Sequence, residues 1–193
     1  MVQVKFQKNY ENLIQKINLL CAKNELEKVI FRAARRASQS GVTVVKKEIS
    51  KETTLKQSTI AKAVKSYVHG EPRSELASAF SIGVRISDTT RPLSEFSFKP
   101  KIPKPHTAPM VEIYRGKQQK FENGAFVQKM PSGHIGIFER EGKSRLPIKE
   151  LRGPSITGIF KAQEGIQDSV FDRIYEILEK RINHEMEYLL SNK

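Results

Sequence analysis

The chain has 193 residues, 38% of them hydrophobic, a length that suits one core of ordinary size and argues against two full domains. Its 34 Lys and Arg residues exceed its 21 Asp and Glu residues, for a formal net charge of +13, so the expected partner is a polyanion or an acidic protein surface. No apolar run reaches the roughly 18 residues that span a bilayer, and the first residues lack the apolar core of a secretory signal, which predicts a soluble protein made in a cytoplasm without membrane contact.

The first predicted element is a short amphipathic helix over residues 8–22, because apolar residues recur there at helical spacing. The single cysteine, Cys21, has no second cysteine with which to form an internal disulfide and is predicted to be a small buried apolar residue. Lys23-Asn24 breaks the pattern, and Asn24 is a favourable N-cap for the helix that follows.

From Glu25 to Ile49, apolar residues return every three or four positions and predict a helix of about 25 residues. Gly41 is its weak point, since a glycine within a helix costs roughly 1 kcal/mol relative to alanine, and it indicates either close packing or a slight bend. Small residues on the same side would let another backbone approach closely: Ala33, Ala34, Ala37, Ser38 and Gly41.

The opposite side of this helix is strongly basic. Its cations are Arg32, Arg35, Arg36, Lys46 and Lys47. Such a run is often no more than a solvated helix face. The functional alternative is a surface that contacts DNA or a neighbouring subunit.

A further basic helix is predicted from Ser58, a favourable N-cap, to Val68, with a stop at His69-Gly70. Residues 1–70 carry 14 basic and 5 acidic side chains, a net charge of +9, whereas residues 161–193 carry 5 and 7, a net charge of −2. This asymmetry indicates that the two ends meet different partners, or that the acidic end of one subunit meets the basic end of the next in a ring.

The middle of the chain changes to strand-like patterns. Residues 79–87 alternate apolar with small or polar residues, as in a half-buried antiparallel strand, and residues 111–116 predict another strand. Between them, the segment Pro-Leu-Ser-Glu-Phe at 92–96 precedes the segment 99–109, which combines prolines with lysines. The segment 99–109 is predicted to be an extended polyproline-like loop and a mobile arm.

A β-hairpin is predicted next, with strands at 125–129 and 134–140 and a turn at 130–133. With the earlier strands it predicts one small sheet of about four or five strands.

A polar turn at 141–144 follows the hairpin. Residues 145–148 are expected to form a short edge strand, because Pro147 cannot donate to a central ladder. Gly153-Pro154 then ends regular structure at a rigid corner.

The last element is predicted to be an amphipathic helix within residues 161–193, flanked by Asp and Glu residues. It is expected to pack across the sheet or against the long N-terminal helix. Its apolar stripe comprises Ile166, Val170, Ile174, Ile177, Leu178, Ile182, Met186 and Leu189.

The predicted fold class is α+β, with N-terminal helices, one of them long, a small antiparallel sheet and a long C-terminal helix. One structural domain overall is expected. Its parts are a basic helical segment at 1–70, a β-rich part at 71–160 that contains the arm at 99–109, and the C-terminal helix at 161–193.

No pattern in the sequence predicts catalysis or a cofactor site. The segment from Gly136 to Ser144 ends like a phosphate-binding loop, but five residues instead of four separate its glycines, and Pro147 follows where a helix must start. The four histidines stand far apart without metal-ligand spacing, and no nucleophile lies near the paired carboxylates of Glu139 and Glu141. We therefore expect no catalytic residue, no cofactor, no metal and no enzymatic activity.

Four short motifs stand in the second half of the chain: GAFV at 124–127, FER at 138–140 with a Gly-Lys pair soon after, RLPIK at 145–149 and GPSI at 153–156. They resemble the phage minor tail protein Z family, the tail completion proteins at the head-proximal end of long non-contractile tails. A looser likeness in an Ala/Arg-rich early helix, the segment 92–96 and the long C-terminal helix extends the resemblance over most of the chain. Its structural motif residues are Gly124, Phe126, Arg140, Pro147, Gly153 and Pro154.

This resemblance implies a structural protein of a siphovirus-like phage or prophage that joins the head-proximal end of the tail tube to the terminator and connector proteins. It also implies a homo-oligomeric ring, hexameric by tail symmetry, assembled in the host cytoplasm and located in the virion tail. In such a ring, the five basic residues named above would face the DNA channel and contact the end of the packaged DNA independently of sequence, or would contact neighbouring subunits.

The alternative is a free basic nucleic-acid-binding or regulatory protein with a helix-turn-helix-like reader. The sequence argues against it, because no tight Gly-containing turn leads into a recognition helix and aromatic residues are not interleaved with the basic ones.

Overall fold

The computed structural model describes residues 2–3, 23–69, 81–105, 107–121, 124–163 and 165–191. The predicted helix at 8–22 and Cys21 lie outside these residues. Side chains are described from Val29 onward within these ranges, apart from Met186, Leu189 and Leu190.

The chain forms two compact units whose segments alternate along the sequence. Unit 1 consists of Met1–Val45, Val64–Ser87 and Gln163–Lys193, and unit 2 consists of Lys46–Ala63 and Asp88–Ala162. The expectation of one structural domain overall stays a prediction.

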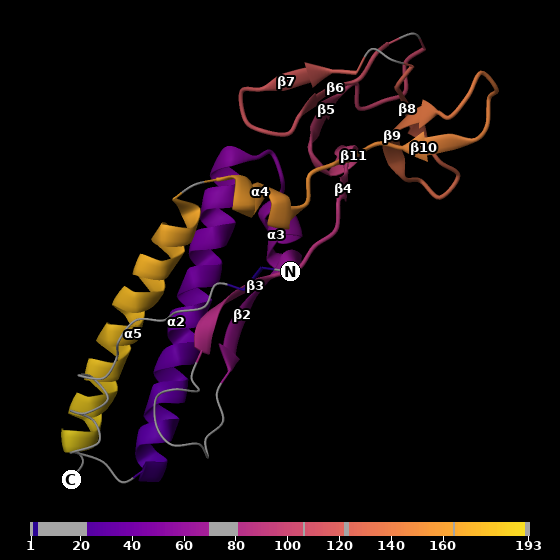
Figure 1. The fold of residues 1–193 in the computed structure, drawn as a ribbon. Helices are drawn as coiled ribbons and strands as arrows, with labels where there is room; N and C mark the ends of the chain where they lie inside the picture. The colour runs from indigo at the N-terminus through magenta and orange to yellow at the C-terminus, as the bar shows by residue number, and fades with distance from the viewer. Residues whose placement is uncertain are drawn as a thin grey trace. The chain divides into compact units, whose positions relative to one another are not determined.

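Two long helices contribute to unit 1 and lie side by side (Figure 1). Helix α2 spans Lys23–Glu52 and helix α5 spans Ile166–Ser191. The predictions of a long N-terminal helix, a long C-terminal helix and contact between them are confirmed. At 30 residues, α2 is longer than expected, and it already includes Asn24, which was predicted to precede it.

Close packing between these helices explains the small residues of α2. A Cβ atom on Gly41 would lie 2.6 Å from Cδ1 of Ile174 in α5 and 3.0 Å from Cγ2 of Val84. No real Cβ atom fits there, so Gly41 allows close approach of neighbouring side chains. The apolar stripe of α5 is buried at Ile166, Val170, Ile174, Leu178 and Ile182.

A three-stranded antiparallel sheet completes unit 1, in the order β1-β3-β2. Its strands are β1 (Val2–Gln3), β2 (Val64–His69) and β3 (Ser81–Ile86). The central strand β3 confirms the strand predicted within 79–87, and its Ile82, Val84 and Ile86 are buried.

The predicted helix from Ser58 to Val68 is only half correct. A short helix, α3 (Gln57–Ala63), ends at Ala63, and the chain continues as β2, in which Val64 pairs with Ile86 and His69 with Ser81. The spacing of Val64, Tyr67 and Val68 fits a helix or a strand, and β-branched and aromatic residues favour a strand once a partner is available. The partner β3 lies farther along the sequence, so local periodicity does not reveal it.

Ser38 links α2 to this sheet. It is fully buried, and its hydroxyl donates to the carbonyl oxygen of Gly83 in β3 and accepts from the backbone N–H of Tyr67 in β2 at 2.9 Å. Replacing Ser38 by alanine should lower the free energy of unfolding by about 1–3 kcal/mol, because both backbone groups would lose a buried partner. Urea denaturation followed by far-UV circular dichroism measures this loss.

Ser40 is the matched control, because it lies two residues away on the same helix. Among the described residues, its hydroxyl donates only to the carbonyl oxygen of Ala37, at 2.6 Å. Ser40→Ala should change stability by no more than about 0.5 kcal/mol, as surface substitutions usually do. Equal losses in the two variants would contradict the structural role assigned to Ser38.

The strands of unit 2 form three small antiparallel sheets. The first has the order β5-β6-β7, the second β10-β9-β8, and the third pairs β11 with β4. The strands are β4 (Arg91–Pro92), β5 (Ser97–Lys99), β6 (Met110–Glu112), β7 (Gln118–Lys120), β8 (Phe126–Lys129), β9 (Ile135–Arg140), β10 (Ile148–Glu150) and β11 (Arg152–Gly153).

The mixed α+β class is confirmed, but the single sheet of four or five strands is replaced by these separate small sheets. Short strands and frequent prolines explain the difference, since a proline interrupts a ladder and a strand of two or three residues pairs with few partners. A 3₁₀ turn at Leu93–Glu95 directly follows β4 and ends that strand.

The predicted hairpin is confirmed as β8 and β9. The backbone N–H of Met130 donates to the carbonyl oxygen of His134 at 2.7 Å, and Gly133 adopts a φ of +85°, which favours glycine. The edge strand that follows is β10 at Ile148–Glu150, a few residues later than the predicted 145–148.

The Pro/Lys segment connects β5 to β6 and contains no helix or strand between Pro100 and Pro109 in its described residues, which confirms a loop there. Lys101 turns back, with its Nζ 3.8 Å from the centre of the Phe98 ring, whereas Ile102 points into solvent with 72% exposure. The mobility of this arm stays a prediction.

A short helix, α4 (Ile156–Ala162), was not predicted from the sequence. It begins just after Gly153-Pro154, and the hydroxyl of Ser155 accepts from the backbone N–H of Gly158 at 3.0 Å, as an N-cap does. Buried Ile156, Ile159 and Phe160 anchor the helix in unit 2.

Candidate subunit or nucleic-acid interface

The basic side of α2 lies opposite its buried small-residue side. Arg32, Arg35, Arg36 and Lys47 are exposed, and Lys46 is half-buried. The structure therefore places all five cations on α2 as predicted, while their contact with DNA or with another subunit stays a prediction.

Arg32 differs from the others because it has an acidic neighbour within the chain. Its Nη1 lies 3.6 Å from Oε2 of Glu185 in α5, a pair that the sequence did not indicate. Within the described part of the chain, Arg35, Arg36, Lys46 and Lys47 form no ion pair.

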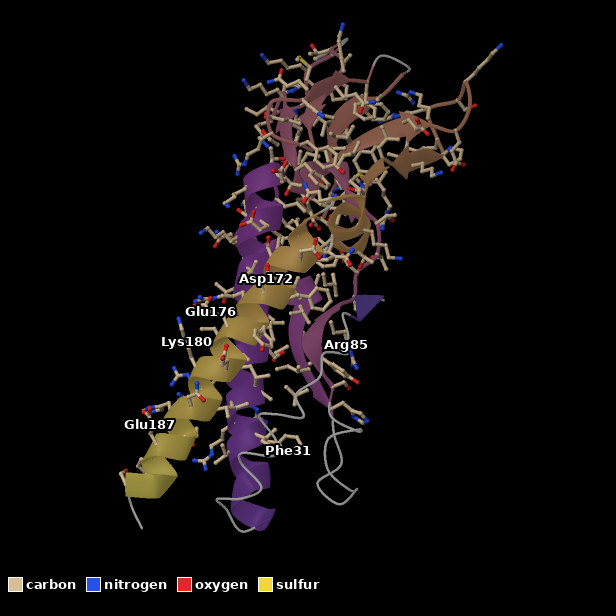
Figure 2. The ribbon with its side chains drawn as sticks, turned by 60° about the vertical axis from the view of Figure 1, so that its left-hand side comes forward. Phe31, Arg85, Asp172, Glu176, Lys180 and Glu187 are labelled. Carbon is tan, nitrogen blue, oxygen red and sulfur yellow. The ribbon has the colours of Figure 1, made fainter. Side chains whose placement is uncertain are left out.

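An acidic face lies along α5. Asp168, Asp172, Glu179 and Glu187 are exposed. Figure 2 shows the labelled Asp172, Glu176 and Glu187 on the side of α5 that points away from α2, with the cation Lys180 among them. The sequence had identified these acids only as flanks of the apolar stripe. The complete helix shows that these acidic side chains lie on one side of α5.

Glu176 differs from the other acids of α5 because it is neutralised within the helix. Its carboxylate lies 2.7 Å from Nζ of Lys180 and 2.8 Å from Nη1 of Arg173. The hydrogen bond from Lys180, and to a lesser extent the one from Arg173, lowers the pKa of Glu176 below its ordinary value. Asp172 and Glu179 have no such partner among the described residues.

On β2 and β3, cationic and aromatic side chains stack on one another. The guanidinium carbon of Arg85 lies 4.7 Å from the centre of the Tyr67 ring, and the rings of Tyr67 and His69 are stacked at 6.2 Å. The sequence did not indicate this cluster, because its pattern predicted a helix over these residues. In a strand, the alternating Lys65, Tyr67 and His69 lie on one face, so an interpretation of the segment as a strand would have indicated the cluster.

Three of the structural motif residues occupy the hairpin sheet or its approach. Gly124 adopts a φ of +73°, which explains glycine at this position. The Phe126 ring lies 6.4 Å from that of Phe138 and 5.2 Å from the guanidinium carbon of Arg140, which in turn donates to the carbonyl oxygen of Arg145 at 2.7 Å. These contacts hold the hairpin and the turn after it.

The other three motif residues shape the chain between β9 and α4. Pro147 is exposed, and its carbonyl oxygen accepts from the backbone N–H of Glu141 at 3.2 Å. A Cβ atom on Gly153 would lie 3.0 Å from Leu93 Cδ2, so a side chain would meet the core of unit 2 there. Half-buried Pro154 follows and ends β11 before α4. The structural role predicted for the six motif residues as a set stays a prediction.

The segment that resembles a phosphate-binding loop has a different structure. Gly136 lies within β9, Gly142 to Ser144 form an exposed turn, and the next element is strand β10 rather than a helix. The arrangement lacks the helix N-terminus that such a loop needs to hold phosphates.

No metal cluster is formed by His, Cys, Asp or Glu side chains among the described residues. His134 forms a pair with Glu150, with Nε2 2.7 Å from Oε1, and His106 lies outside the described ranges. In the helices that the structure describes, no segment combines the length and apolar character needed to cross a bilayer.

The model of one protein family, prophage minor tail protein Z, matches residues 8–193, nearly the whole chain. The chain belongs to the prophage minor tail protein Z family. No curated protein and no solved structure matches it significantly. As a phage minor tail protein, it is a component of the virion tail, and its family is one of structural proteins.

Proposed function

We propose that this minor tail protein completes the tail, by joining the head-proximal end of the tail tube to the terminator and connector proteins. It would do so as a homo-oligomeric ring of a siphovirus-type tail, six copies by tail symmetry, and through interfaces rather than through catalysis.

The family match over residues 8–193 carries this proposal. The surface of unit 1 supports it, because α2 and α5 present opposite charges with few ion-pair partners among the described residues.

The basic residues of α2 have two possible partners in such an assembly, the phosphates of the packaged DNA end and the carboxylates of another protein. A free DNA-binding regulator is not favoured, because α3 has seven residues and continues directly into β2, which leaves no recognition helix after α2.

Deletion of the gene from the phage or prophage tests the proposed function. Electron microscopy should find filled heads and separate tails, and expression of the wild-type chain from a plasmid should restore joined particles. A specific antibody should label the head-proximal end of the restored tails. Joined, infectious particles without the protein would contradict the proposal.

A further inference from the structure

The two outer faces of unit 1 carry opposite charge, and they meet at the ion pair of Arg32 with Glu185. Exposed Arg35 and Arg36 stand on α2, and exposed Asp172 and Glu179 stand on α5, yet no ion pair joins the two sets. The helices themselves are neighbours, with Gly41 of α2 against Ile174 of α5. The two charged faces therefore point in different directions, and neither set has an ion-pair partner among the described residues.

The spacing of these residues suits contact between two helices. Residues on an α-helix turn by about 100° and rise by about 1.5 Å each, so Asp172 and Glu179 differ by about 20° around α5 and by about 10 Å along it. The adjacent Arg35 and Arg36 diverge by about 100°. Two long guanidinium side chains that diverge in this way can reach two carboxylates along one helix, with the fork geometry that carboxylates accept.

We propose that Arg35 and Arg36 on α2 of one subunit bind Asp172 and Glu179 on α5 of a second copy of this chain. The contact is head-to-tail, because it uses a different surface on each subunit, and such contacts generate rings when the rotation closes. This inference rests on the proposed function in one respect: it takes the second copy to be the neighbouring subunit in the tail.

Charge complementarity favours a second copy over DNA. Phosphates would satisfy the arginines of α2 but would leave the carboxylates of α5 without a cationic partner. A second copy satisfies both faces at once, and each ring position then repeats the same contact.

Charge-reversal variants of the purified full-length chain test the contact. Their self-association is measured by sedimentation at about 0.1 M salt, where charges interact over roughly 10 Å. Arg35→Glu/Arg36→Glu and Asp172→Lys/Glu179→Lys should each weaken self-association about tenfold or more, because attraction becomes repulsion. An equimolar mixture of the two variants should restore association, since the acidic α2 of the first variant matches the basic α5 of the second, and the basic α2 of the second matches the acidic α5 of the first.

Lys129→Glu/Lys149→Glu is the control for Arg35→Glu/Arg36→Glu, because it makes the same change in net charge at two exposed positions of unit 2. It should associate like the wild type. Association that stays unchanged in both reversal variants, or is not restored by mixing, would overturn the contact, and so would a wild-type chain that remains monomeric. Loss of DNA binding in Arg35→Glu/Arg36→Glu with normal association would assign the arginines to DNA instead. Particle joining in the deletion phage reports on the proposed function separately.

Discussion

Replacing Gly41 by leucine is expected to lower the free energy of unfolding by about 3 kcal/mol, the upper part of the range for overpacked cores. The Cβ atom alone would lie 2.6 Å from Cδ1 and 2.7 Å from Cγ1 of Ile174, and 3.0 Å from Cγ2 of Val84. Ile174 is fully buried and Val84 is 1% exposed, so neither has solvent into which to move. Urea denaturation followed by circular dichroism at 222 nm, where α2 and α5 dominate, measures the loss.

Gly41→Ala separates packing from helix propensity. Alanine gains about 1 kcal/mol in a helix relative to glycine, yet its Cβ meets the same atoms, so a net loss of about 1 kcal/mol is expected. Shortening the facing residue, Ile174→Val, should recover part of that loss in the double variant, as coupling between contacting residues requires.

Gly142 is the matched control for glycine replacement. Nothing lies within 4 Å of a Cβ atom built there, and its φ is not in the left-handed region. Gly142→Ala should leave stability within about 0.5 kcal/mol of the wild type. If Gly41→Ala were as stable as Gly142→Ala, the close packing of α2 with α5 would not be what requires glycine.

The long helices could be predicted from the sequence because their signals are local and repeated. The stripe of α5 continues for several turns, so its buried residues from Ile166 to Ile182 follow from periodicity alone. The row of small residues on α2 likewise predicted a close neighbour, although the identity of that neighbour, Ile174, depends on tertiary structure.

The short elements could not be predicted with equal accuracy because their conformation depends on distant partners. Val64–His69 becomes a strand only because β3 pairs with it, and α4 follows a Gly-Pro pair that ordinarily signals the end of structure. Strands of two to four residues carry too little alternation to reveal which ones share a sheet.

The candidate interface was predictable in part. Arg35 and Arg36 were recognised from sequence as exposed cations, and they are exposed. The pairing of Arg32 with Glu185 was not predictable, since these residues are far apart in the sequence and meet only when α2 packs beside α5. Position on a helix face can thus be inferred from spacing, whereas partners require the fold.

Replacing Asp88 by alanine is expected to destabilise unit 2 by about 3 kcal/mol, the loss typical of breaking a mostly buried ion pair. The Asp88 side chain is 6% exposed, and its Oδ2 accepts a hydrogen bond from Arg91 Nε at 2.8 Å, while Oδ1 forms an ion pair with Nη2 of the same arginine at 2.6 Å. Oδ2 also accepts from the backbone N–H of Ile156 at 3.1 Å, which fixes the start of α4. The hydrogen bond that Arg91 donates to Asp88 raises the pKa of Arg91 above its ordinary value. In the variant the guanidinium still stays charged, because arginine does not lose its proton in proteins, and it lacks its main partner.

Hydrogen exchange of the α4 amides, resolved by mass spectrometry, locates this effect, because loss of the Asp88 carboxylate should speed exchange in residues 156–162 more than elsewhere in unit 2. Glu95→Ala is the matched control: Glu95 contacts the same Arg91, but at 3.4 Å and with 33% exposure, so its removal should cost less than about 1 kcal/mol. Asp88→Asn keeps one acceptor oxygen and should fall between the two. Unchanged exchange in α4 of Asp88→Ala would show that Ser155 alone suffices to cap this helix. The hydrogen bond that the Ile156 N–H donates to Asp88 would then contribute little to the stability of unit 2.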